Sequence, residues 1–307
     1  ALGRIGDPAG AAGVAKAEQS SDAFLHLIGA WGAARLSGGN VEKTTAVVKE
    51  LIATLSDSQR FHRELAARAL LELGAPPEMI SAELDKVAKD LPPEKMELLI
   101  GAFASLGSRV VPRATELLKD PLRRERALRI LARIGEDSAP AVPELVKLLQ
   151  DADPKVRTES LFVLAAIGPK AEAAVAPATA LLADPDRDVM LTAGYALGKI
   201  GPAAKSAMPA LQKLLSSDDQ MTHLTGVWAL LKIDPKNQDL GKSAVPLLAA
   251  ALKHSYDFVR GEAAITLGEL GPLSASAVPA LEAAAASDPS PAVRSAAAAA
   301  IKKIKGA

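Results

Sequence analysis

The sequence predicts an all-α protein, an α-solenoid in which antiparallel helix pairs stack into a superhelix. The first observation behind this prediction is an internal repeat: AVPELVKLLQDADPKVRTESLFVLAAIG (141–168) and VAPATALLADPDRDVMLTAGYALGKIG (175–201) match almost position for position. The second observation is that glycines and prolines recur along the chain with nearly one spacing. Repeats of this length stack on their neighbours and share one continuous core.

Two landmarks carry the period. Glycines that end an apolar run are 33, 28, 33, 33, 33 and 37 residues apart, with Asp234 in the place of one of them. Prolines after valine or a similar residue are 31, 34, 32, 37 and 33 residues apart. The glycines are Gly74, Gly107, Gly135, Gly168, Gly201 and Gly271, and the prolines are Pro112, Pro143, Pro177, Pro209, Pro246 and Pro279. The agreement of two independent landmarks makes chance a poor explanation.

Each unit is predicted to form two helices. The first carries the proline and an apolar face, such as Leu145, Leu148 and Leu149. Asp-Pro pairs are expected to open the second helix, because Asp accepts hydrogen bonds from free N–H groups and Pro fits the first helical position. The second helix should end at glycine in a left-handed conformation. The Asp-Pro pairs begin at Asp120, Asp153, Asp184 and Asp288.

The motifs A-V-P-x-L, D-P-x-x-V-R and A-L-G-x-I-G make the unit resemble a HEAT repeat, in particular the short HEAT-like repeat of the phycobilisome lyase type. The resemblance covers about 105–305 well and 41–104 more loosely. One departure is the period, which is shorter than the roughly 40–47 residues of general HEAT repeats. The resemblance implies that the second helix of each pair lines the concave side of the solenoid.

The domain organisation expected is one continuous solenoid of about eight helix pairs over 41–307. Residues 1–40 should hold a truncated repeat and an irregular helical pair, because ALGRIGDPAG (1–10) matches the end of a second helix. We therefore expect the chain to be a fragment of a larger protein, of bacterial origin.

Composition excludes several function classes. Lys plus Arg and Asp plus Glu both number 36, so no net charge attracts nucleic acid or an anionic membrane. The chain has no cysteine, no visible signal sequence and no apolar run of the roughly 18 residues that span a membrane. We expect a cytoplasmic rather than a periplasmic protein. The four histidines show no ligand spacing, so we expect neither a metal nor a cofactor.

Counting back 11 residues from each helix-ending glycine aligns a column of arginines. An arginine just inside a helix start opposes the helix dipole. We therefore expect these side chains to pair with Asp residues of their own or the adjacent turn, such as Asp153 or Asp288, and to form a structural ladder. Met190 and His223 interrupt it. The ladder consists of Arg63, Arg124, Arg157, Arg260 and Arg294.

Five residues further on, a second column carries Phe162, Tyr195 and Trp228 in consecutive repeats. Helical geometry turns this column about 140° past the arginines, so we expect it to face outward. Lys199 and Lys232 flank it, and a basic group of Arg123, Arg126, Arg129 and Arg133 is expected beside it. One interpretation is a groove that anchors a partner through aromatic rings and a basic patch. The alternative is that the rings pack on one another and the arginines form a solvated face.

The function expected is a non-catalytic scaffold that binds another protein on the concave face of the solenoid, alone or within a larger complex. No catalytic motif supports an enzyme: G-x-S-x-G and the P-loop are both absent from the sequence. The lyase-type resemblance implies an alternative, a subunit that holds a tetrapyrrole or its acceptor protein. A third hypothesis is nucleic-acid binding by the arginine group, which the neutral charge opposes.

Overall fold

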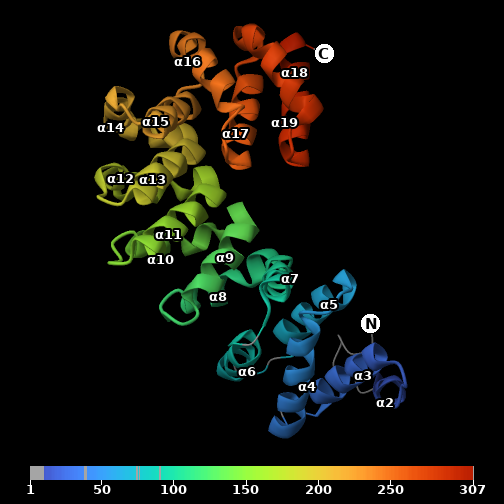
Figure 1. The fold of residues 1–307 in the computed structure, drawn as a ribbon. Coiled ribbons are helices and arrows are strands. Elements are labelled where there is room, and N and C mark those ends of the chain that lie inside the picture. Colours follow the sequence, from blue (N-terminus) through green and yellow to red (C-terminus); the bar gives the residue numbers. More distant parts are fainter. Residues whose placement is uncertain (1–9, 38–39, 74, 76, 90, 307) are drawn as a thin grey trace. The chain divides into compact units, whose positions relative to one another are not determined.

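The computed structural model describes residues 10–37, 40–73, 75, 77–89 and 91–306, and these residues form helices and no strands. The predicted all-α solenoid is confirmed (Figure 1). Contacts divide the chain into two units, Ala1–Ser138 (unit 1) and Ala139–Ala307 (unit 2). The expected boundary between 40 and 41 remains a prediction, and the helix end expected within 1–10 falls almost wholly outside the described residues.

Unit 1 contains helices of very unequal length. They are α2 (Ala11–Glu18), α3 (Ala23–Leu36), α4 (Val41–Thr54), α5 (Arg60–Glu72), α6 (Pro77–Lys89), α7 (Pro93–Ala104), η2 (Gly107–Arg109), α8 (Val111–Leu117) and α9 (Arg124–Ile134). The core of this unit includes Leu27, Val48 and Leu51. The boundary between the two units, after Ser138, falls within the short 3-10 helix η3 (Gly135–Ala141).

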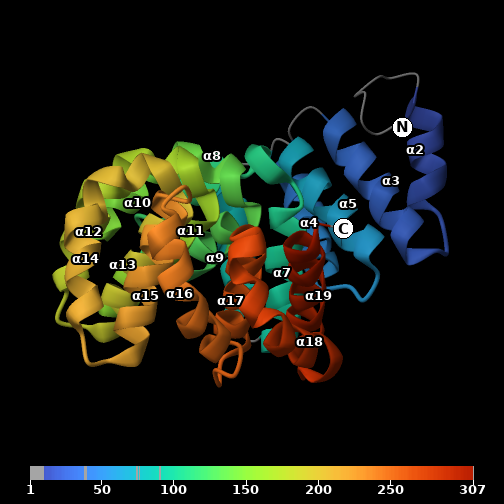
Figure 2. The same cartoon turned by 90° about the horizontal axis from the view of Figure 1, so that it is seen from above.

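Unit 2 alternates first and second helices, and most of its first helices are short or broken into 3-10 segments. Its first-helix segments are α10 (Val142–Leu148), η4 (Gly168–Ala174) with α12 (Val175–Ala180) and η5 (Leu181–Ala183), η6 (Gly201–Ala207) with α14 (Met208–Lys213) and η7 (Leu214–Ser216), α16 (Gln238–Ala251), and η8 (Gly271–Ala277) with α18 (Val278–Ser287). The second helices are α11 (Pro154–Ile167), α13 (Arg187–Ile200), α15 (Gln220–Ile233), α17 (Asp257–Glu269) and α19 (Pro291–Lys305). Figure 2 shows α12 and α14 in one layer and α13 and α15 in the next.

Glycine ends the second helices because the chain needs a positive φ there. Gly168 and Gly201 have φ of 68° and 72°, a region that disfavours other residues. Their ψ values of −135° and −141° differ from the left-handed helical conformation that we predicted. The chain therefore leaves α11 and α13 through a sharp extended turn rather than a left-handed cap.

Asp residues open the second helices, but in two different ways. Asp153 caps α11 as predicted and accepts a hydrogen bond from the N–H of Lys155 at 2.9 Å. The prediction was wrong for Asp120, Asp184 and Asp288. Each of these accepts from an N–H that precedes the helix, that of Leu122, Asp186 or Ser290, and so forms a turn before the helix begins.

One apolar segment, Pro154–Ala183, is long enough to cross a membrane by length and composition alone. The prediction of no such run counted only uninterrupted apolar residues, and this segment contains Lys170 and Glu172. In the structure 56% of its most apolar stretch is buried. The chain turns within it at Gly168, so the segment consists of α11, η4, α12 and η5.

Candidate functional site

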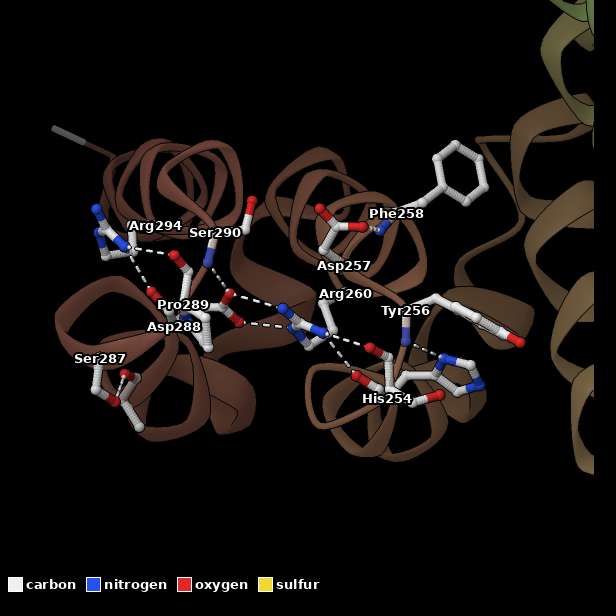
Figure 3. A network of polar contacts seen from close by, with 12 residues as sticks. His254, Tyr256, Asp257, Phe258, Arg260, Ser287, Asp288, Pro289, Ser290 and Arg294 are labelled. Carbon is white, nitrogen blue, oxygen red and sulfur yellow. Dashed lines mark hydrogen bonds and ion pairs between the residues drawn. The ribbon is translucent and has the colours of Figure 1, made fainter. Parts of the chain in front are cut away.

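Arginines near the starts of second helices bind the loops that precede those helices. Nη1 of Arg157 donates to the carbonyl oxygens of Asp151 at 2.9 Å and Ala152 at 3.1 Å. Arg63, Arg260 and Arg294 make the same pair of bonds, to the carbonyls six and five residues earlier (Figure 3). These carbonyl oxygens offset the unfavourable position of the cation at a helix start.

Two of these arginines also reach the next repeat. Nη2 of Arg157 donates to Asp184 at 2.8 Å. Arg260 grips Asp288 with Nε at 2.7 Å and Nη2 at 2.9 Å, as Figure 3 shows. The hydrogen bonds from Arg260 hold the pKa of Asp288 below its ordinary value. Asp153, the other partner that we predicted, caps its own helix instead.

The arginine ladder changes at three positions. Arg124 in unit 1 donates to the carbonyl of Leu118 at 2.8 Å through Nε. Met190 and His223 stand where arginine would bind the loop, so α13 and α15 lack these bonds. In the loop before α17, Nδ1 of His254 accepts from the N–H of Tyr256 at 3.1 Å, as Asp does in other repeats.

Four aromatic rings meet on the second helices of unit 2. The rings of Tyr195 and Trp228 stack with centroids 5.1 Å apart and planes at 20°. Phe162 lies 6.3 Å from Tyr195, and Phe258 of α17 meets Tyr195 edge-on at 5.1 Å. We call these four residues the aromatic cluster. Each such pair contributes about 0.5–1.5 kcal/mol beyond its burial.

The aromatic cluster is exposed at its ends and buried in its middle. Phe162 and Phe258 are 46% and 50% exposed, whereas Trp228 is only 6% exposed. The prediction that the whole row faces outward is therefore wrong for Trp228, because α17 covers it. Tyr195 and Trp228 pack on each other, as the alternative interpretation held.

Two glycines of α13 allow this packing. A Cβ atom on Gly198 would lie 2.3 Å from Cζ3 of Trp228, and one on Gly194 would lie 2.5 Å from Cγ2 of Thr225. Neither position can carry a side chain without movement of α15. Trp228 therefore occupies space that glycine leaves free on the neighbouring repeat.

Polar contacts hold Trp228 and its lysine in place. The indole Nε1 of Trp228 donates to the hydroxyl of Thr266 on α17 at 3.1 Å. Lys232 lies 5.5 Å from the centroid of the indole ring and forms an ion pair with Glu269. Lys232 is therefore neutralised within the chain rather than free to bind a partner.

Glu262 of α17 lies at the centre of a second polar group. It accepts from the hydroxyl of Tyr195 and from Nζ of Lys199, both at 3.4 Å. Lys199 is also 5.7 Å from the ring centroid of Tyr195. Burial, followed by the nearby Glu262 carboxylate, raises the pKa of Tyr195 well above its ordinary value. Tyr195 is therefore a neutral hydrogen-bond donor here.

These contacts join repeats that are not adjacent. Tyr195 is on α13, and its partners Glu262 and Phe258 are on α17, with α15 between them. Repeats in a solenoid ordinarily contact only their immediate neighbours. The stack in unit 2 therefore bends toward its second helices at α15.

A small cavity lies beside the aromatic cluster, with a volume of about 70 Å³. Its lining is almost wholly apolar, and Thr225 and Glu262 are the polar residues among it. The lining consists of Tyr195, Met221, Leu224, Thr225, Trp228, Leu248, Phe258, Val259, Glu262 and Ala263. We call this cavity the Trp228 pocket.

A family model of HEAT repeats matches the chain in three overlapping windows, at residues 111–197, 142–230 and 209–302. The windows together cover more than half of the chain. The chain belongs to the HEAT repeat family. No curated protein matches it.

Several solved structures resemble the HEAT repeats of this chain. An engineered protein is 23% identical, with 96% of this chain and 88% of that chain covered, at a TM-score of 0.40. Computationally designed armadillo repeat proteins for modular peptide recognition are 23% identical, with 63% of this chain and 99% of that chain covered, at a TM-score of 0.39. Kap121p is 13% identical, with 96% of this chain and 37% of that chain covered, at a TM-score of 0.46.

The arginine group expected beside the aromatic row belongs to unit 1 and is paired with carboxylates. Arg123 and Arg126 both bind Asp85. Burial alone would raise the pKa of Asp85, but hydrogen bonds from these arginines lower it. Arg129 and Arg133 both bind Glu97. Two arginines thus share each carboxylate, and the binding role of this basic patch stays a prediction.

Sequence inspection missed Phe258 and Glu262 because they lie outside the column that was aligned. Phe258 is seven residues before Ile265, which holds the aromatic position in its HEAT repeat. Seven residues are about two helical turns, so both positions share one face of α17. Comparing whole helix faces, rather than one column, would have found Phe258. Among the described residues, no three His, Asp or Glu side chains could together hold a metal ion.

Proposed function

We propose that the chain is a non-catalytic HEAT-repeat scaffold that binds another protein along the second helices of unit 2. The observation that carries this proposal is the pair of half-exposed rings, Phe162 and Phe258, on either side of the stacked rings of Tyr195 and Trp228. Aromatic side chains held rigidly at a surface give large contact areas at low entropic cost, and they dominate many protein interfaces.

The bend at α15 supports the same surface. Tyr195 on α13 contacts Phe162 on α11 and Phe258 on α17, which supports an inner surface formed by these three second helices. An inner surface can touch a partner segment from several repeats at once. The concave face that the sequence predicted is accordingly the face that we propose for binding.

The lyase-type resemblance supports a second hypothesis, a subunit that holds an acceptor protein or a tetrapyrrole. An apolar cavity of about 150 Å³ holds a single benzene ring. The Trp228 pocket, at about 70 Å³, has about half that volume. Its size therefore favours the acceptor protein over the pigment within this hypothesis.

The test of the proposal is affinity capture from the native source with Phe162→Ser/Phe258→Ser. Both side chains are half-exposed, so their loss should leave the fold intact. The affinity for the captured protein should fall at least about tenfold, because interface aromatics typically contribute more than 1 kcal/mol each. The matched control is Phe61→Ser, which removes an exposed phenylalanine from unit 1. Equal losses for both variants, or none for either, would contradict the proposal.

A further inference from the structure

We propose that the Trp228 pocket receives one branched aliphatic side chain of the partner, and that a basic side chain of the same segment lies beside it. The inference rests on the proposed function and names the chemistry of its partner. The pocket opens beside Phe258 and Tyr195, so a segment that lies on the aromatic cluster passes over it.

Volume decides between an aliphatic and an aromatic occupant. A dry apolar cavity of about 150 Å³ holds benzene, whereas a single water needs only about 10–15 Å³. At about 70 Å³, the pocket has about half the volume of that benzene cavity and is far larger than a water needs. A side chain of three or four carbons, such as that of leucine, isoleucine or valine, fits this range.

The lining decides between an apolar and a charged occupant. Met221, Leu248 and Val259 form its apolar wall, together with the aromatic rings. The carboxylate of Glu262 already faces the ammonium group of Lys199 and the hydroxyl of Tyr195. A cation inside the pocket would therefore lose its hydration without gaining an unpaired anion.

Charge at the rim favours a basic neighbour. Asp188 is exposed, and its carboxylate forms no hydrogen bond or ion pair with other described residues. It is seven residues before Tyr195, about two helical turns, so it shares that face of α13. Met221 on α15 and Phe258 on α17 line the pocket, and each is likewise seven residues before the aligned position of its helix, Trp228 or Ile265. Since Glu262 faces Lys199, Asp188 supplies a carboxylate near the pocket that has no partner among the described residues.

The spacing sets the partner motif. In an extended segment, side chains two residues apart point to the same side, about 6–7 Å from each other. Neighbouring helix axes are about 8–10 Å apart. A basic residue two positions from the aliphatic one can therefore reach Asp188 on α13 while the aliphatic side chain fills the pocket beside α15.

The probe is the blocked tripeptide acetyl-Leu-Ala-Lys-amide, titrated into the full chain. Trp228 is one of two tryptophans, and its indole N–H gives one of two resolved NMR signals, assigned with Trp31→Phe. We expect this signal to shift with a Kd on the order of 1 mM, since a tripeptide makes few contacts. Peptides with Ala or Phe in place of Leu should bind at least fivefold more weakly.

Two variants separate the pocket from its rim. Val259→Phe should fill the pocket and abolish the shift, and thermal unfolding checks that it folds. Asp188→Asn leaves the pocket intact, so Leu should still be preferred. This variant should lose the preference for acetyl-Leu-Ala-Lys-amide over acetyl-Leu-Ala-Glu-amide, a difference of up to about fivefold in the parent.

The results also separate this inference from the proposed function. Phe162→Ser changes the aromatic cluster without touching the pocket, and Val259→Phe does the reverse. One outcome would contradict the pocket proposal and still support the scaffold. In that outcome Phe162→Ser loses the captured partner, Val259→Phe keeps it, and the peptides show no preference for Leu over Phe. A Leu preference that Val259→Phe abolishes supports the pocket, whichever protein is captured.

Discussion

Trp228 shows how one residue depends on its neighbours in two other repeats. Its ring stacks on Tyr195, its indole nitrogen donates to Thr266, and its edge fills the space beside Gly198. The sequence aligned Trp228 correctly with Phe162 and Tyr195. It could not show the burial of Trp228, because that depends on how closely α17 approaches.

Gly198→Ala should destabilise the protein by about 1–3 kcal/mol, because the added Cβ would overlap the indole ring of Trp228. The matched control is Gly261→Ala, where the nearest atom to a new Cβ is 4.0 Å away. That control should stabilise the protein by about 0.5–1 kcal/mol, since alanine favours a helix over glycine. Chemical denaturation of both variants measures the difference. Equal effects would contradict the packing described for Trp228.

At the scale of the helix pair, neighbouring second helices pack on one another, and arginine side chains add links between the loops of successive repeats. The period, the helix pairs and the glycine turns were predictable because each leaves a residue type at a fixed position. Asp184 and Asp288 were misassigned as helix caps, because an Asp three residues before a helix forms a turn that looks identical in sequence. The sequence did not reveal which carboxylate each arginine binds, since the partners lie 27 and 28 residues away.

Arg157→Met should destabilise the protein by about 1–3 kcal/mol, because buried hydrogen bonds to Asp184 and to two carbonyls are lost. Arg187 offers the matched control, since it also binds an Asp of the next repeat, Asp219, but at the surface. Exposed ion pairs contribute little, so Arg187→Met should change stability only slightly. Thermal unfolding compares the two. A larger loss for Arg187→Met would contradict the role of the arginine ladder.

Asp219 gives the helix pair a dependence on pH. The hydroxyl and then the N–H of Thr222 donate to Asp219, and with Arg187 they lower its pKa from 3.8 to about 2. A carboxyl with a lowered pKa in the folded state stabilises that state above pH 3.8, and this contribution is lost as the pH falls toward 2. Asp219→Asn should keep the helix cap but lose this dependence. Denaturation of parent and variant across that range should therefore converge near pH 2, and a constant gap would refute the assignment.

The whole molecule is a HEAT-repeat chain, and its candidate site lies where the repeats depart from their pattern. The regular features, such as Gly168, Gly201 and the arginine ladder, build the stack and were predictable from the period. The departures at Met190 and His223 remove the ladder from α13 and α15. These two helices also carry Tyr195 and Trp228, so the candidate site lies where the regular links are absent.

The measurement that tests the central claim most directly is photo-crosslinking from defined positions of unit 2 in an extract of the native source. A photoreactive phenylalanine replaces Phe162 on α11 in one variant and Ala176 on α12 in another, both exposed positions. The account predicts a specific protein adduct from position 162 and none from position 176. The same adduct from position 176, with none from 162, would place the partner on the first helices and contradict the account.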